Sequence, residues 1–392
     1  MRQGWQIKKL SEVATISSGN AAPQRKELFE KGIYPFIRTS DVGQIRKGYI
    51  NSCVDYLNKE GIKGLKLFKK GTILFPKSGA STFLNHRVMM VIDSFVSSHL
   101  ATIKANSSVA EDGFLFYYLT TIDARDLMQD IAYPSLKTSD IGLIGIPIPP
   151  LPEQQRIVAI LDEAFASIAK AKSNAEQNLK NAKELFESYV ETVFENKSDV
   201  WKRKSLGEVC EISSKLIDPK SSMYQNLLHI GGGNIESKTG TLIDLKTAKE
   251  ENLISGKFLF DNRMVLYSKI RPYLMKVVKC EFEGLCSADI YPLLGFNNLM
   301  IRDFLYYLLL TKKFTDYAIQ GSQRAGMPKV NRDHLFEYQF NLPPITTQQT
   351  IVNKLDALSL ENKKLQAIFQ QKLHDLEELK KSVLQKAFKG EL

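Results

Sequence analysis

Two long stretches of this chain carry apolar residues at alternating steps of four and three, the spacing of one helix face. Neither contains Gly or Pro for about 45 residues after its start, which predicts helices of roughly 65–70 Å. Helices of this length are typical of a coiled coil, in which polar residues such as Asn178, Asn362 and Lys372 set the register. A single amphipathic helix on a globular core is the alternative, but two matching stripes in one chain favour mutual pairing. The first stripe comprises Ile157, Leu161, Ala164, Ile168, Ala171, Ala175, Ala182, Leu185 and Tyr189, and the second comprises Ile351, Leu355, Leu358, Leu365, Phe369, Leu376, Leu379 and Val383.

Both stretches begin with the same motif. The first reads Pro149-Pro-Leu-Pro-Glu-Gln-Gln-Arg-Ile-Val-Ala-Ile-Leu-Asp162, and the second reads Pro343-Pro-Ile-Thr-Thr-Gln-Gln-Thr-Ile-Val-Asn-Lys-Leu-Asp356. Eight of the 14 positions are identical, and the copies lie 194 residues apart. Proline suits the start of a helix because its missing N–H would be unpaired there. A period this long is too large for a solenoid unit and indicates two copies of a domain with its helix.

The segments before the two helices repeat each other at a few landmarks. Each consists of short β-type runs bounded by turn residues, which predicts a mixed α/β domain with a mostly antiparallel sheet. Between the landmarks the segments diverge completely, which favours one scaffold built twice to recognise two different targets. The matching landmarks are Trp5–Ser18 with Trp201–Ser214, Ile73–Ser78 with Met264–Lys269, and Gly113–Tyr118 with Asp303–Leu308.

The predicted fold class is therefore α+β, with two similar mixed α/β domains joined by two long helices in an antiparallel coiled coil. Antiparallel pairing would place the domains at opposite ends of the rod, related by a pseudo-twofold axis. The aromatic residues of Gly113–Leu119 are expected in the core rather than on a base-stacking platform. The predicted boundaries are residues 1–148 and 199–342 for the domains, and residues 149–198 and 343–392 for the helices.

Composition narrows the function classes. The 392 residues carry a formal net charge of +10, and residues 1–148 alone hold 19 Lys and Arg against 13 Asp and Glu. This surplus suggests a polyanionic partner, while the charge says nothing about the fold. The four cysteines form no CxxC pair, so we expect neither a disulfide framework nor a zinc site, and a reduced cytoplasm. No apolar stretch long enough for a membrane span and no signal peptide is predicted.

No catalytic centre emerges from the sequence. The glycine-rich segment His229–Ile235 could hold a cofactor phosphate or S-adenosylmethionine, but it lacks GxGxxG spacing and a downstream acidic partner. Its counterpart Phe36–Val42 has no glycine, so a turn needing positive φ is the favoured interpretation. The five histidines are scattered, and neither a P-loop nor a nucleophile elbow is present. We expect no bound cofactor and no metal.

Recognition chemistry remains. Arg and Lys can fork onto guanine O6 and N7, Gln can bridge adenine N6 and N7, and other polar side chains can hold phosphates. For any single residue, a solvated surface charge is at least as good an interpretation. The segments Lys77–Ser81 and Ser268–Tyr273 are the best candidates, because each follows a strand that both domains share. The candidate DNA-binding residues are Arg25, Arg38, Lys77, Ser78, Ser81, Arg87, Lys137, Lys215, Lys238, Lys269, Arg271, Tyr273, Gln323, Arg324 and Lys329, with Lys26, Lys47, Tyr133, Lys220, Tyr224 and Arg332 in the same loops.

With these features the sequence resembles the specificity (S) subunits of type I restriction-modification systems over essentially its whole length. The resemblance rests on the doubled helix start, on the two Trp/Leu-x-Glu-Val domain starts and on the closing Ala387-Phe-Lys-Gly-Glu-Leu392. One departure is Thr346-Thr347, which stands where the first copy has Pro152-Glu153.

The resemblance implies a non-catalytic subunit with two target recognition domains, each reading half of a bipartite, asymmetric site in double-stranded DNA. The paired helices would act as a spacer and dock two methyltransferase (M) subunits, which carry S-adenosylmethionine and methylate adenine N6. Restriction (R) subunits, with ATP and Mg²⁺, would complete the complex. A coiled-coil scaffold that binds proteins is the alternative function, and a self-contained methyltransferase is disfavoured by the missing catalytic motif.

Overall fold

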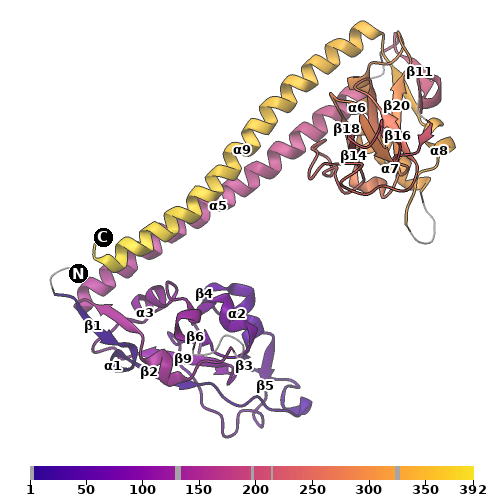
Figure 1. Ribbon diagram of the computed structural model, residues 1–392. Coiled ribbons are helices and arrows are strands. Elements are labelled where there is room, and N and C mark those ends of the chain that lie inside the picture. The colour runs from indigo at the N-terminus through magenta and orange to yellow at the C-terminus, as the bar shows by residue number, and fades with distance from the viewer. Residues whose placement is uncertain (1–3, 129–133, 196–197, 213–214, 323–326) are drawn as a thin grey trace. The chain divides into compact units, whose positions relative to one another are not determined.

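The computed structural model describes residues 4–128, 134–195, 198–212, 215–322 and 327–392. The chain forms two compact units, Met1–Asn174 with Lys372–Leu392, and Ala175–Gln371. Each unit holds one globular domain and a part of both long helices (Figure 1). None of the helices in the described ranges is long and apolar enough to cross a membrane.

The first domain contains a two-stranded sheet of order β1-β10, a five-stranded sheet β2-β9-β6-β7-β4 and a three-stranded sheet β5-β3-β8. Its strands are β1 (Gln6–Lys9), β2 (Ala14–Ser18), β3 (Tyr34–Ile37), β4 (Lys47–Ile50), β5 (Asp55–Leu57), β6 (Ile73–Pro76), β7 (Arg87–Met90), β8 (Phe95–Val96), β9 (Leu100–Ala105) and β10 (Gly145–Ile148). Its helices are α1 (Leu10–Val13), α2 (Thr39–Ile45), α3 (Asp112–Leu119) and α4 (Thr138–Gly142), with 3-10 turns η1 (Lys26–Leu28), η2 (Ala80–Leu84) and η3 (Ala124–Leu127).

The second domain contains a two-stranded sheet β11-β21, a four-stranded sheet β12-β20-β17-β18 and a five-stranded sheet β13-β16-β19-β14-β15. Its strands are β11 (Lys202–Ser205), β12 (Cys210–Ile212), β13 (Leu216–Ile217), β14 (Leu228–Ile230), β15 (Lys246–Thr247), β16 (Lys257–Phe260), β17 (Met264–Ser268), β18 (Val277–Lys279), β19 (Gly284–Ser287), β20 (Ile290–Gly295) and β21 (Gln339–Leu342). Its helices are α6 (Arg302–Leu309), α7 (Lys312–Gln320) and α8 (Arg332–Phe336), with η4 (Leu206–Glu208) and η5 (Pro272–Leu274).

The two domains share a scaffold. The order β2-β9-β6-β7 in the first corresponds to β12-β20-β17-β18 in the second, and both runs are antiparallel throughout. The parallel pair β3/β8, with Phe36 opposite Phe95, corresponds to β14/β19, with His229 opposite Leu285. The predicted mixed α/β fold with mostly antiparallel sheets is therefore confirmed, and the domains differ by added strands, β4 in the first and β13 and β16 in the second.

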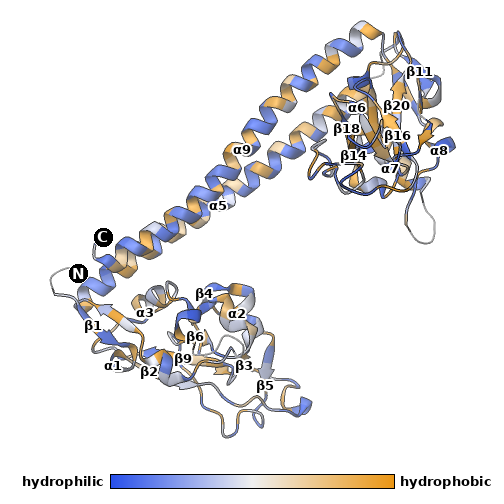
Figure 2. Ribbon diagram, viewed as in Figure 1, coloured by the Kyte–Doolittle hydropathy of each residue, from blue (hydrophilic) through white to orange (hydrophobic). Residues whose placement is uncertain are grey.

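Each domain has a core of its own beside its helix. Phe114, Leu115 and Leu119 of α3 are fully buried, as are Phe304 and Leu305 of α6. The strands behind them are largely hydrophobic (Figure 2). The aromatic residues after position 113 are thus core residues, as the sequence predicts. Burying such side chains stabilises the fold by about 1.5–3 kcal/mol each.

The long helices are α5 (Leu151–Phe194) and α9 (Ile345–Lys389), and they run antiparallel within each unit. In the first unit, Arg156 donates to the backbone oxygen of Leu392 at 2.6 Å, and Lys172 forms an ion pair with Glu377 at 2.6 Å. In the second, Phe186 lines a pocket with Gln366, and Val193 lines another with Thr350. As residue numbers rise along α5, the residues that it contacts on α9 and after it have falling numbers. The two helices are therefore antiparallel, as predicted.

The predicted apolar stripes are partly wrong. Leu185, Leu365 and Leu379 are 73%, 41% and 48% exposed. On α9 the less exposed face continues from Leu355 in steps of four and three through half-buried polar positions. An unbroken helix keeps residues three and four apart on the same face. The face that packs near Leu355 therefore continues in that spacing, even where it contains polar residues. The half-buried positions of this face are Ser359, Asn362, Gln366, Phe369, Leu373, Leu376, Lys380 and Val383.

Candidate nucleic-acid interface

The loop after β6 is hydrogen-bonded to a distant segment. The N–H of Leu136 donates to the oxygen of Lys77 at 2.8 Å, and the N–H of Gly79 donates to the oxygen of Pro134 at 2.8 Å. Residues 77–81 and 134–137 together are named the first paired loop. They bring Lys77, Ser78, Ser81 and Lys137 into one place, although Lys137 lies more than 50 residues away in sequence.

The second domain repeats this arrangement after β17. The N–H of Val330 donates to the oxygen of Lys269, and that of Arg271 to the oxygen of Pro328, both at 2.9 Å. Residues 269–273 and 327–331 are named the second paired loop. It gathers four of the predicted residues, Lys269, Arg271, Tyr273 and Lys329.

The side chains of the two paired loops differ. In the first, Lys137 is exposed at the start of α4, and Lys77 is half-buried. Ser81 is half-buried, and its Oγ donates to the backbone oxygen of Ser78 at 3.0 Å. In the second, Arg271, Tyr273 and Lys329 are exposed. One backbone arrangement thus presents an amine-and-hydroxyl set in one domain and a guanidinium, a phenol and an amine in the other.

Lys269 is a correction to the predicted surface set. It is 8% exposed, and its Nζ donates to the backbone oxygen of Ala288. Asp289 lies 3.5 Å from this amine and 3.6 Å from that of Lys329. Burial, and next the charge of Lys329, lower the pKa of Lys269, while Asp289 opposes the shift. Lys269 therefore holds the loop and does not reach out of it, because its amine is taken up by a backbone carbonyl.

Arg87 is a second correction. It is fully buried, because strand alternation directs it to the same side of β7 as Met89, which packs on the core. Its guanidinium lies 3.3 Å from the ring centre of Phe75, and its Nη1 donates to the oxygen of His86 at 2.7 Å. Nε and Nη2 have no partner among the described residues, and burial lowers the pKa of Arg87 to about 9. In this structure Arg87 is a core residue.

Arg38 and Arg25 are not part of the first paired loop. Arg38 forms an ion pair with Asp55, and its guanidinium lies 5.6 Å and 5.3 Å from the ring centres of Phe29 and Phe36. Arg38 and Asp55 line an open pocket of 390 Å³, while Arg25 is exposed at the start of η1. The pocket around Arg38 can hold a phosphate, because this arginine stays partly exposed beside the rings of Phe29 and Phe36.

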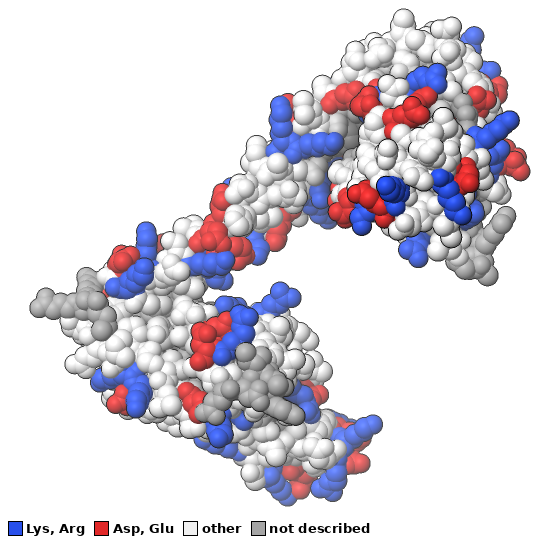
Figure 3. Space-filling model, in the orientation of Figure 1, with Lys and Arg blue, Asp and Glu red and all other residues white. Residues whose placement is uncertain are grey.

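The remaining candidates are dispersed or outside the described residues. Lys238 pairs with Glu187 of α5 at 3.1 Å, so its amine faces the long helix. Lys215 is exposed beside the edge strand β13. Gln323, Arg324 and Tyr133 lie outside the residues that the structure describes. On the face shown in Figure 3, basic and acidic side chains are interspersed over both units.

The glycine-rich segment is not the turn that the sequence predicts. None of Gly231, Gly232 and Gly233 has positive φ. A backbone bond closes the turn, from the N–H of Asn234 to the oxygen of Gly231 at 3.0 Å, and the Oδ1 of Asn234 also accepts from the N–H of Gly231 at 2.8 Å. A type I turn has this backbone bond and no residue with positive φ, so the chain can turn here without one.

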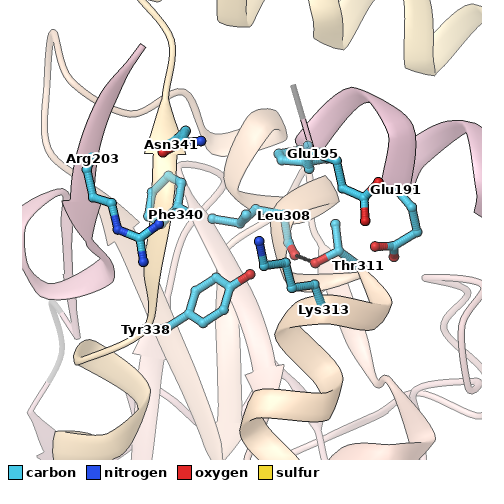
Figure 4. A pocket seen from close by; sticks show the side chains of 10 residues that line it. Glu191, Glu195, Arg203, Leu308, Thr311, Lys313, Tyr338, Phe340 and Asn341 are labelled. Atoms are coloured by element: carbon cyan, nitrogen blue, oxygen red, sulfur yellow. Dashed lines mark hydrogen bonds between the residues drawn. The ribbon is translucent and has the colours of Figure 1, made fainter. Parts of the chain in front are cut away.

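A mixed-charge pocket of 450 Å³ lies in the second unit between the end of α5 and the two-stranded sheet β11-β21. Figure 4 shows Glu191 and Glu195 on one side and Arg203 on the other, with Lys313 and Tyr338 between them. Burial raises the pKa of Glu191, and the backbone N–H of Lys312 opposes the shift. The two carboxylates can pair with a positive group of a ligand, and the arginine and lysine can pair with a negative one. Among the described residues, no three His, Cys, Asp or Glu lie close enough to hold a metal ion.

The roles of the identical motif residues were missed from sequence. Gln154 is fully buried, and its Nε2 donates to the oxygens of Val109 at 2.9 Å and Pro149 at 2.8 Å. Its Oε1 accepts from the N–H of Glu111, the residue before α3, at 2.9 Å. The side chain thereby joins the domain to the start of α5.

The second copy does the same. Gln348 donates to the oxygens of Leu299 at 2.8 Å and Pro343 at 2.9 Å, and it accepts from the N–H of Ile301 before α6 at 2.9 Å. Both glutamines are among the eight identical motif positions. The signal was therefore present in the repeat, but its meaning required the contacts.

The last motif residue forms a second junction in each unit. The hydroxyl of Tyr117 on α3 donates to Asp162 of α5, and that of Tyr307 on α6 donates to Asp356 of α9 at 2.7 Å. Tyr49 adds a 3.0 Å bond to Asp162. Burial raises the pKa of Tyr117 and of Tyr307, and the carboxylate that accepts each hydroxyl adds to the shift. Each domain is thus fastened to its long helix at two polar points.

Known proteins match this arrangement. A family model described as the type I restriction modification DNA specificity domain matches the chain twice, over residues 2–180 and 198–370. The chain therefore belongs to this family of DNA specificity domains.

Individual relatives are similar to the chain over different lengths. The specificity subunit of the type I restriction enzyme EcoDI from Escherichia coli is 30% identical over 292 residues, which cover 66% of this chain and 65% of that protein, less than two thirds of its length. A solved chain from a study of the assembly of a type I R-M system covers 100% of this chain and 99% of its own, with TM-score 0.79 and 20% identity. The HsdS subunit from Thermoanaerobacter tengcongensis covers 100% and 98%, with TM-score 0.63 and 21% identity. At these identities the two structures establish the fold.

Proposed function

We propose that this chain is the non-catalytic, DNA-reading specificity subunit of a type I restriction-modification complex. The observation that carries the proposal is the pair of equivalent loops. The same backbone hydrogen bonds recur in both domains, but the exposed side chains differ. A shared scaffold with unshared side chains is what reading two different half-sites of double-stranded DNA requires.

The division of labour follows from the chemistry of the side chains. Exposed Lys137, Arg271 and Lys329 can hold phosphates or fork onto guanine edges. The net charge of +10 contributes a sequence-independent attraction that falls steeply with salt. Short half-sites then suffice, since part of the affinity comes from the phosphate backbone.

The long helices serve as spacer and docking surface in this proposal. Half-sites one helical turn apart lie about 34–36 Å from each other along DNA. A helix of 44 residues, such as α5, can span that separation, because it rises roughly 66 Å. Two M subunits would dock on these helices and methylate adenine N6, and R subunits would join them. S-adenosylmethionine, ATP and Mg²⁺ would belong to these partners, and the complex would work in the cytoplasm.

The test is the methylation pattern in cells that express this chain with its cognate M subunit, compared with M alone. Single-molecule sequencing should find N6-methyladenine in one bipartite motif with a fixed unread gap. Exchanging residues 1–148 for those of a relative should change one half of the motif only. Methylation that never depends on this chain would overturn the proposal and favour a protein-binding scaffold.

A further inference from the structure

The two paired loops turn at the same residue. Gly79 and Arg271 occupy equivalent places, since each donates its N–H to a proline oxygen across the loop. Both have positive φ, 71° at Gly79 and 51° at Arg271. The ψ angles differ, at −169° and 64°. The first combination is open only to glycine, whereas the second is the left-handed region that other residues enter at a cost.

Arginine at this place is not required by the backbone. Glycine enters the left-handed region without strain, and asparagine enters it more easily than arginine does. The loop bonds at residue 271 are its N–H to Pro328 and its oxygen, which accepts from Leu274 at 2.9 Å. Any residue can make these backbone bonds. The side chain of Arg271 therefore has another reason to be there.

That reason is not found inside the protein. Arg271 is exposed, and among the described residues no carboxylate pairs with it. Tyr273 and Lys329 are exposed in the same paired loop. An arginine in the left-handed region, with a free guanidinium and an exposed tyrosine and lysine in the same loop, is suited to an external planar acceptor.

We propose that Arg271 is a specificity-determining residue of the second domain and selects a G·C pair in its half-site. The inference rests on the proposed function. The guanidinium fork matches the O6 and N7 acceptors of guanine in the major groove. The first domain has Gly79 at this place and must read its half-site with other side chains. The two half-sites are therefore expected to differ in sequence.

The experiment compares the full chain with Arg271→Gly and Arg271→Asn, each expressed with the cognate M subunit. Both variants keep the left-handed backbone and lose the fork. We expect an unchanged or higher melting temperature, and a tenfold or greater loss of discrimination at one position of one half-site, about the value of a bidentate contact. The other half-site and the gap should stay as they are.

Other outcomes overturn the inference separately from the proposed function. If the parent chain directs a bipartite motif and both variants direct the same one, Arg271 does not read a base. A uniform loss across all sites would make it a phosphate contact, and a lower melting temperature with an unchanged motif would make it structural. If the parent chain directs no methylation, the proposed function itself fails.

Discussion

The paired loops and the junctions with the long helices differ in how they are repeated. At the junctions the two units use the same side chains, Gln154 with Gln348 and Asp162 with Asp356, on nearly the same partners. At the paired loops the backbone bonds recur, with a lysine and a proline at equivalent acceptor positions, but the exposed side chains differ. A junction must place a domain in the same way twice, so its chemistry is fixed, whereas a reading surface is free to vary. Position and recognition are therefore encoded in separate residues.

The strongest test of this comparison removes a buried glutamine. Gln348→Met or Gln154→Met keeps the volume but leaves three backbone groups unpaired, a buried proline oxygen and two half-buried groups. Each unpaired group costs about 1–3 kcal/mol, and the two half-buried groups lie at the low end because water reaches them, so we expect the free energy of unfolding to fall by about 3–5 kcal/mol in either unit. Denaturant titration measures it, with the exposed neighbours Gln349→Met and Gln155→Met as controls. A small effect in one unit alone would show that the junctions are not equivalent.

Removing the tyrosine hydroxyls should have a smaller effect. Tyr307→Phe and Tyr117→Phe each lose a bond to a carboxylate, which contributes about 1.5–3 kcal/mol. The loss should lie at the low end, because Tyr49 still bonds Asp162, and Lys279 lies 3.6 Å from Asp356. Thermal unfolding of the two variants and of the double variant measures it. Losses that do not add would indicate coupling between the units.

Arg87 tests whether burial outweighs charge. Replacing it by Met removes a buried guanidinium with unpaired nitrogens, and the second domain has Val277 opposite Tyr267 in the corresponding strand pair. We expect the free energy of unfolding to stay level or rise by up to about 2 kcal/mol. Arg125→Met, on an exposed ion pair, is the control. A loss of methylation activity with an intact fold would instead support the original surface interpretation of Arg87.

The smallest expected effect concerns pH. Burial lowers the pKa of His229, against the opposing influence of Glu251, whose Oε2 lies 2.8 Å from its Nδ1. The folded state therefore favours the neutral ring, and unfolding takes up a proton as the pH falls below about 6.5. Stability should decline from pH 7 to 5, and His229→Gln should flatten that decline. Urea midpoints at several pH values measure it, with exposed His374→Gln as the control.

The sequence alone determined the features that depend on local pattern. Helix periodicity and the doubled Pro-Pro motif predicted α5 and α9 with their antiparallel pairing, because a helix face is set by residues three and four apart. The repeated landmarks predicted one scaffold built twice. They also indicated the loops after β6 and β17 as the places where the domains differ.

The tertiary structure decided what depends on residues far apart in sequence. It joined residues 77–81 to 134–137, buried Arg87 and Lys269, and set the phase of the α9 face through Asn362. The sequence does not show whether a charged side chain is solvated or donates to a backbone carbonyl inside the protein. The burial of Arg87 and Lys269 could therefore not be predicted. The left-handed backbone at Arg271 likewise became visible only where the second paired loop closes on Pro328.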